Sequence, residues 1–181
     1  MSFVERYRSV ADLPPPSLRD IDLTEFVAGI ERLMRARMKE QGITFESCTS
    51  ASLPSLRADP ELLEQAVINL LHNAVEAVAD VSDPHVRIAC TPVLEHVIIA
   101  ISDNGPGLPG KEHEHIFVPF FTTKRGGSGI GLSVARYVAL AHGGQLDVCA
   151  NEPRGAVFSL RLPMSWHSPI AVRFPALAQA K

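Results

Sequence analysis

The sequence predicts an α/β two-layer sandwich, in which helices lie on one face of a mixed sheet. Apolar residues recur at helical spacing over residues 24–41 and 59–79, so each of these segments has a face to bury. Short apolar runs that are typical of paired strands follow, at 86–90, 97–102, 145–149 and 156–162. Helices interspersed with such strands are expected to pack against one face of the sheet.

The first predicted helix begins at Thr24, whose hydroxyl can cap free backbone amides, and runs to about Gln41. Gly42 then ends it, because glycine readily takes the left-handed conformation that closes many helices. A strand over 43–48 and a short strand over 56–58 are expected to follow.

The second predicted helix begins at Asp59 and Pro60, an N-cap followed by a proline at the first helical position, and reaches about Ala79. The strands 86–90 and 97–102 are expected to join through a turn at 91–95. The chain then continues with a helix over 132–141 that two glycines end, and with a last hairpin that turns at 151–155.

Asp103 is the first candidate functional residue, because it follows the apolar run 97–101 and so lies at the end of a buried strand. A desolvated carboxylate there needs a fixed donor, and the exocyclic amine of a purine is such a donor. Gly105 and Gly107 bracket Pro106 and allow a sharp turn with no side chain in the way of a planar base. This turn predicts the base-binding end of a nucleotide pocket.

A second glycine cluster, Gly126, Gly127, Gly129 and Gly131, precedes a helix that begins at Leu132. Bare amides at a helix N-terminus bind phosphate well, and the positive end of the helix dipole adds to the attraction. The cluster therefore predicts the phosphate-binding end of the same pocket.

Asn69 and Asn73 stand four residues apart and therefore on one face of the second predicted helix. They lie within an otherwise apolar pattern, and two amides on a buried face need partners. One interpretation is that they cross-link the local backbone. The glycine motifs that follow them in order favour the other interpretation, in which both amides face a nucleotide.

With these motifs the chain resembles the catalytic, ATP-binding domain of sensor histidine kinases, in the GHKL superfamily with gyrase B, Hsp90 and the MutL proteins. The resemblance covers roughly residues 20–163 and implies the Bergerat ATP-binding fold. It rests on the family's boxes in order, at 69–77 (N box), 103–108 (G1 box), 117–124 (F box) and 127–132 (G2 box). Later landmarks of the family match 142–144, 155–158 and 162–163.

The resemblance implies that ATP and Mg²⁺ bind here. Asn73 is then a catalytic residue that ligates Mg²⁺ through its amide oxygen, with Asn69 supporting the same shell. Lys124 is the other catalytic candidate, placed to offset charge on the terminal phosphate. The expected nucleotide-binding residues are Asn69, Asn73, Asp103, Gly105, Gly107, Leu108, Lys124, Gly127, Ser128, Gly129, Ile130, Gly131 and Leu132.

Two positions depart from patterns of the family. ATP-hydrolysing relatives carry a glutamate that activates water four residues before the metal asparagine, where this chain has Asn69. An amide cannot take a proton, so Asn69 favours a kinase over a hydrolase. Glu76 stands where many members carry a basic residue, which leaves one phosphate contact in doubt.

The residue that accepts the phosphoryl group is expected to lie outside this chain. In the family, the acceptor histidine is typically followed by an acidic residue and, one helical turn later, by a proline. His113-Glu114 begins in this way, but Pro119 is displaced from the expected position, and the segment falls in the lid of the pocket, at about 109–128. Residues 1–19 resemble the remnant of a dimerisation and phosphoacceptor helix with a proline-rich linker, and 164–181 are expected to form a poorly ordered tail. The implied partners are the hairpin of the same parent protein and a downstream response regulator.

Two alternatives remain beside the kinase. One is a regulatory module that binds nucleotide without transferring phosphate, and the other is a serine kinase or ATPase of the same superfamily. Asn69 argues against hydrolysis, while the intact Asn73, Asp103, Lys124 and second glycine cluster argue against an inactive module.

Composition excludes several other classes. With 181 residues, 20% charged, and a net charge of −3, the chain suits one core and offers no basic field for nucleic acid. Its three cysteines are far apart and without metal-ligand spacing, as expected for free thiols in a reducing cytoplasm. No apolar run approaches the roughly 20 residues of a spanning helix, so no membrane contact is expected from this chain and any anchor would lie elsewhere in its parent.

Overall fold

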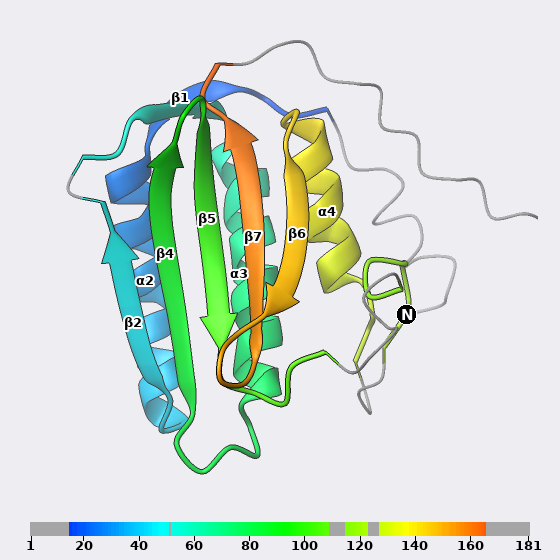
Figure 1. The fold of residues 1–181 in the computed structure, drawn as a ribbon. Coiled ribbons are helices and arrows are strands. Elements are labelled where there is room, and N and C mark those ends of the chain that lie inside the picture. Colours follow the sequence, from blue (N-terminus) through cyan, green and yellow to red (C-terminus); the bar gives the residue numbers. More distant parts are fainter. Residues whose placement is uncertain (1–14, 51, 109–114, 123–126, 166–181) are drawn as a thin grey trace, which may run out of the picture.

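The fold is a two-layer α/β sandwich, as the sequence predicts. The computed structural model describes residues 15–50, 52–108, 115–122 and 127–165. In these residues the helices are α2 (Leu23–Glu40), α3 (Pro60–Ala77) and α4 (Gly131–Ala141), and they all lie behind one face of the sheet (Figure 1). Most of the expected helix remnant and linker, 1–14, and most of the expected tail, 166–181, lie outside the described residues.

The main sheet is mixed, which confirms the predicted class. Across the described part of the chain its order is β2-β4-β5-β7-β6, with β2 parallel to β4 and the other neighbours antiparallel. The strands are β2 (Thr44–Thr49), β4 (His85–Val93), β5 (His96–Asp103), β6 (Gln145–Ala150) and β7 (Ala156–Pro163). The last strand of the described residues, β7, therefore lies inside the sheet, between β5 and β6 (Figure 1).

A separate small sheet pairs β1 (Arg19–Asp22) with β3 (Ser55–Ala58). The sequence predicts β3 but not β1, because the segment Arg-Asp-Ile-Asp carries little of the apolar alternation that marks a strand. The strand β1 forms because its backbone pairs with β3, and the pattern of its side chains does not indicate this pairing. The predicted domain boundary at residue 20 falls within β1.

Helix α2 begins two residues earlier than Thr24 suggests, so the prediction of its N-cap was wrong. Asp22 holds that position, and its carboxylate accepts hydrogen bonds from the backbone amides of Thr24 (2.7 Å) and Glu25 (3.1 Å). A carboxylate caps better than a hydroxyl because its charge also complements the helix dipole. At the other end Gly42 has a φ of +68° just beyond the last turn, as predicted.

The strands β4 and β5 are longer than the sequence indicates. The predicted turn at 91–95 contracts to Leu94 and Glu95, because 91–93 continue the ladder up to the pair Val93↔His96. The two strands thus form one long hairpin in the middle of the sheet, and the second of them ends at Asp103.

Helix α3 is the central helix of the fold, and its capping agrees with the prediction. The carboxylate of Asp59 accepts hydrogen bonds from the amides of Leu62 (3.0 Å) and Ser17 (2.7 Å). The helix buries residues on most of its circumference, because the sheet covers one side and α4 packs on another. The buried residues are Leu62, Leu63, Ala66, Val67, Leu70, Leu71, Ala74 and Val75.

His142 fastens the end of α4 to the start of α3. It is 2% exposed, its Nδ1 donates to the carbonyl oxygen of Val138 (2.7 Å), and its Nε2 accepts from the amide of Asp59 (2.9 Å). The bond from the Asp59 amide requires the neutral ring, because a protonated Nε2 cannot accept. Burial lowers the pKa of His142, although the Val138 carbonyl and the Asp59 carboxylate act in the opposite direction. These contacts make His142 a residue of the fold, because they join two helices.

The stability that His142 contributes should fall as pH drops below about 6.5, the ordinary pKa of histidine. Since the folded pKa lies below the unfolded value of about 6.5, protons favour the unfolded chain, and stability present above pH 6.5 is lost as pH falls below it. We expect His142→Gln to be less stable at pH 7.5 but to lose less stability on acidification, measured by urea unfolding at each pH.

The pKa of His72 is also lowered, by burial and by Arg37, and would contribute to the same slope. His72→Gln, alone and combined with His142→Gln, separates the two contributions. Equal pH slopes for the wild type and His142→Gln would contradict the role assigned to His142.

Candidate nucleotide-binding site

A cavity of about 590 Å³ opens between α3, the end of β5 and the start of α4. Its volume lies within the range of about 300–1,000 Å³ that is usual for small-molecule sites. The structure brings together there most of the residues that the sequence selects, from segments far apart in the chain. The predicted residues that line it are Asn69, Asn73, Asp103, Gly107, Leu108, Gly127, Ser128, Gly129, Gly131 and Leu132.

Three predicted residues behave differently. Gly105 and Ile130 do not appear in the cavity wall. Gly105 lies against α3 instead, where an added Cβ would come within 2.7 Å of the Ala77 carbonyl oxygen, so it makes the turn possible without lining the cavity. Lys124 lies outside the described residues, as do Gly126 and His113.

The asparagine pair, Asn69 and Asn73, faces the cavity from α3. Both side chains are half-buried, which corrects the expectation of a fully buried face. An added Cβ at Gly131 would lie 3.6 Å from the Cβ of Asn69, so the first residue of α4 adjoins the first of the two amides. Two neutral amide side chains and a helix N-terminus therefore border the same region of the cavity.

Asp103 lies at the opposite end and is only 2% exposed. Its Oδ1 accepts the amide hydrogen of Gly105 (2.9 Å), which closes the turn directly after β5. Gly107 has a φ of +76°, and an added Cβ would lie 2.9 Å from the carbonyl oxygen of Gly155. Glycine is required there both for its backbone conformation and for the close approach.

The second glycine cluster reaches the cavity through α4. Gly129 has a φ of +64°, and its carbonyl oxygen accepts a hydrogen bond from the amide of Phe120 (2.8 Å). An added Cβ would lie 2.5 Å from the Phe120 carbonyl carbon, so this contact also requires glycine. Ile130 holds the N-cap position of α4, and the next residues, Gly131 and Leu132, line the cavity.

The segment 115–122 forms an apolar wall opposite α3. Ile116 and Phe121 line the cavity, and the guanidinium of Arg136 lies 5.1 Å from the centre of the Phe117 ring. This cation–π contact joins the segment to the exposed side of α4. The wall therefore packs on the helix whose N-terminus borders the cavity.

Sequence reasoning did not select several lining residues. They are His72, Ala77, Asp80, Pro106, Ile116, Phe121, Thr122, Ala156 and Phe158. Helical spacing from Asn69 and Asn73 could have indicated His72 and Asp80. Ala156 and Phe158 could not be found in this way, because they reach the cavity only through the pairing of β7 with β5.

The charge of the cavity wall is acidic. Glu76, Asp80 and Asp103 line it, whereas the described lining residues include no lysine or arginine. In the described part of the chain no cluster of three or more His, Cys, Asp or Glu residues is arranged to hold a metal ion. An anionic ligand therefore needs cations that come with it or from residues beyond the described ones.

Comparison with known proteins decides the family. The family described as histidine kinase-, DNA gyrase B-, and HSP90-like ATPase matches residues 58–165. This range includes α3 with its two asparagines, both glycine motifs and β7. The chain belongs to this ATPase family. The resemblance that the sequence motifs indicate is thereby confirmed.

Sensor histidine kinases are among the relatives within this ATPase family. ZraS of Escherichia coli strain K12 is 30% identical over 149 residues, which cover 82% of this chain and 32% of ZraS. The nitrogen regulation protein NtrY of Azorhizobium caulinodans is 33% identical over 165 residues, covering 88% of this chain and 21% of NtrY. The chain thus spans about a third or less of these relatives.

Solved structures of the family share the architecture. The catalytic domain of the histidine kinase ThkA aligns with a TM-score of 0.75 and 30% identity, over 82% of this chain and 96% of that domain. Full-length ShkA in complex with AMPPNP aligns with a TM-score of 0.78 and 26% identity, over 91% of this chain and 35% of ShkA. None of the helices that the structure describes has the length and apolar character needed to cross a membrane.

The acidic wall predicts that Glu76 weakens nucleotide binding. Removing one exposed like charge is worth roughly 0.3–1 kcal/mol. We therefore expect Glu76→Gln to bind a fluorescent ATP analogue about two- to fivefold more tightly, with the gain shrinking at high salt. Glu64→Gln is the matched control, because Glu64 is exposed on the same helix and outside the cavity. Equal affinities of the two variants would show that Glu76 does not act on the ligand's charge.

Proposed function

We propose that this chain binds ATP with Mg²⁺ and acts as the catalytic domain of a sensor histidine kinase. It transfers the γ-phosphoryl group to a histidine on a hairpin outside the chain. One observation carries the proposal: the asparagine pair, the buried Asp103 and the N-terminus of α4 border a single cavity. The complex of the similar protein ShkA with AMPPNP supports it.

Asp103 is the proposed partner of the adenine base. Asp103 is 2% exposed, so its carboxylate has lost its contacts with water. A fixed N–H donor therefore stabilises the carboxylate strongly. The exocyclic amine of adenine is such a donor. Leu108, Ala156 and Phe158 supply apolar surface around a planar ring.

The phosphates are proposed to lie toward α4. The amides of its first turn carry the positive end of the helix dipole, and Gly131 leaves space for close approach. Ser128, Gly129 and Leu132 belong to the same binding segment, and Lys124 is proposed to offset charge on the terminal phosphate.

The residues on α3 fit a magnesium ion by their chemistry. Mg²⁺ prefers oxygen ligands and keeps several waters, so a single amide oxygen from Asn73, supported by Asn69, suits it better than a closed cage of carboxylates. When bound, the ion neutralises phosphate charge, which the acidic wall cannot do. Asn73 and Asn69 orient that part of the ligand.

The nucleophile must come from outside. The side chain of Asn69 cannot accept a proton, so this position does not activate water for hydrolysis. With ATP held in line, transfer needs only a correctly placed imidazole nitrogen, because positioning contributes most of the catalysis of phosphoryl transfer. The proposed downstream partner is a response regulator, since the similar histidine kinase ThkA has been solved in complex with one, TrrA.

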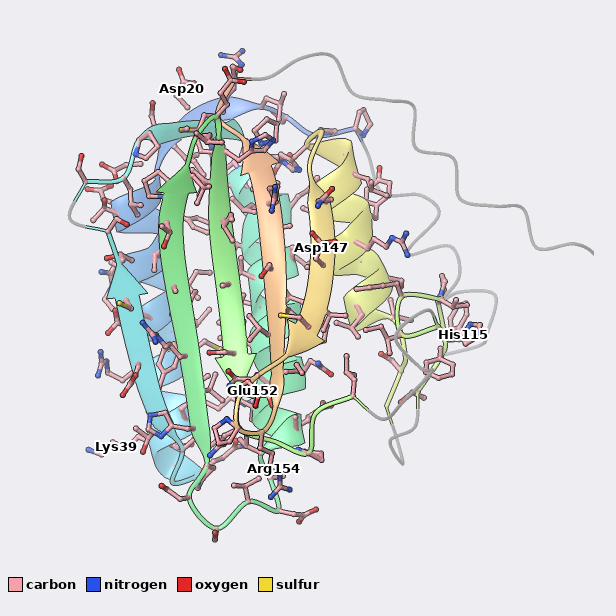
Figure 2. All side chains as sticks on the ribbon, in the orientation of Figure 1. Asp20, Lys39, His115, Asp147, Glu152 and Arg154 are labelled. Carbon is pink, nitrogen blue, oxygen red and sulfur yellow. The ribbon has the colours of Figure 1, made fainter. Side chains whose placement is uncertain are left out.

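Replacement of Asp103 tests the proposed base contact. Asp103→Ala removes a hydrogen bond to a charged group, worth roughly 1.5–3 kcal/mol, so affinity for ATP should fall about ten- to hundredfold. The control is Asp147→Ala, because Asp147 is exposed on β6 away from the cavity (Figure 2). Titration with a labelled ATP analogue measures both, and unchanged affinity in Asp103→Ala would exclude the base assignment.

Transfer can be tested by adding the missing hairpin in trans. The chain alone should bind ATP and consume very little of it. Mixed with a separately produced hairpin of its own parent protein, it should label that hairpin's histidine slowly, because the tether that raises effective concentration is absent.

Asn73→Ala should abolish this labelling, whereas Gln65→Ala should not. Gln65 carries the same amide group on the exposed side of α3 and does not line the cavity. Rapid ATP hydrolysis by the isolated chain would favour an ATPase. Binding of ATP without labelling of a folded hairpin would favour a regulatory module.

A further inference from the structure

The backbone of Asp103 lies one residue beyond the ladder that joins β5 to β7. The register between these strands ends at the pair Ser102↔Val157, although β4 still pairs with Asp103 through Val86. The carbonyl oxygen of Asp103 accepts a hydrogen bond from the side chain of Asn151, with Nδ2 2.8 Å away. A side-chain amide of the β6–β7 turn thus continues the pairing where the strand stops.

Asn151 is itself held in a fixed place. Its backbone amide donates to the carbonyl oxygen of Gly155 (3.0 Å), which closes the turn between β6 and β7. Gly155 has a φ of +117°, and an added Cβ would lie only 1.8 Å from the carbonyl oxygen of Asp103. The turn therefore contacts this carbonyl group twice, through the Asn151 amide and through the Gly155 backbone.

The other groups of Asp103 are fixed by the turn that follows it. The carboxylate accepts from the amide of Gly105, and the amide of Asn104 donates to the carbonyl oxygen of His85 (3.2 Å). His85 belongs to β4, and the Asn151 bond adds a partner from the β6–β7 turn. Because Asp103 is 2% exposed, water cannot readily replace it.

We propose that Asn151 is a positioning residue that aims the Asp103 carboxylate and so sets the selectivity of the cavity for adenine. Asn151 does not line the cavity and acts only through Asp103. This inference rests on the proposed function, in which Asp103 binds the exocyclic amine. Without the Asn151 bond the peptide after Asp103 keeps the bond from the Asn104 amide to His85 but loses the partner of its carbonyl oxygen, so it can tilt. A hydrogen bond that depends on direction weakens steeply with misalignment.

The fold does not depend on the Asn151 side chain in the same way. The β6–β7 ladder is continuous up to Ala150↔Ala156, and the backbone amide of Asn151 still closes the turn in a variant. Asn151→Ala should therefore change the aim of Asp103 more than the stability of the sheet. Asn151→Asp tests the donor directly, because the carboxylate has the same shape but offers an acceptor to another oxygen.

The experiment compares the dissociation constants of ATP and inosine triphosphate. The inosine base has a carbonyl oxygen in place of the amine, so it lacks the exocyclic N–H donor that is proposed to bind Asp103 and carries its nearest donor one position away, at N1. We expect Asn151→Ala and Asn151→Asp to weaken ATP binding about tenfold and to leave inosine triphosphate within about twofold, since the bond that loses its alignment is the charged one between adenine and the Asp103 carboxylate. Arg154→Ala, an exposed position on the same turn, is the control (Figure 2).

The ratio of the two constants distinguishes positioning from damage to the fold. A partly unfolded variant has fewer active molecules but keeps the ratio, so only a change in the ratio supports the proposal. Equal losses for both nucleotides, or no loss for either, would overturn it. If the wild type shows no preference for ATP, or if Asp103→Ala retains that preference, the proposed base contact fails instead.

Discussion

The hydrogen bond between Asp59 and His142 fixes where the start of α3 meets the end of α4. The two helices are antiparallel and both extend to the same side of this bond. Asn69 lies ten residues after Asp59 and Gly131 eleven before His142. At about 1.5 Å per residue both are roughly 15 Å from the bond, which is why the first amide and the first turn of α4 meet.

The cavity separates two kinds of recognition. At the Asp103 end a buried carboxylate is surrounded by backbone and apolar residues, and its hydrogen bonds depend on direction. Toward α4 the polar groups are side-chain amides and backbone amides, which accept or donate hydrogen bonds without carrying a charge. The acidic wall adds repulsion toward an anion, so strong binding requires a cation to accompany it.

Sequence reasoning succeeded where the determinants are local. The capping pair Asp59-Pro60, the stop at Gly42 and the asparagine spacing each act within a turn or two of helix, and each appears in the structure. Sequence reasoning failed where an element or a contact depends on the pairing of distant strands. The strand β1 has little apolar character, and Phe158 lines the cavity only because β7 pairs with β5. The cap of α2 was misplaced because Asp22 and Thr24 both satisfy the local rule.

The place of β7 within the sheet affects the order in which the domain can form during synthesis. The chain emerges with β4, β5 and β6 before β7, yet β7 separates β5 from β6. Until β7 arrives, one edge of β5 offers unpaired backbone groups to any passing strand. The same strand carries Ala156 and Phe158 into the cavity wall, so a ribosome-bound chain that ends before residue 156 lacks both the closed sheet and a complete cavity.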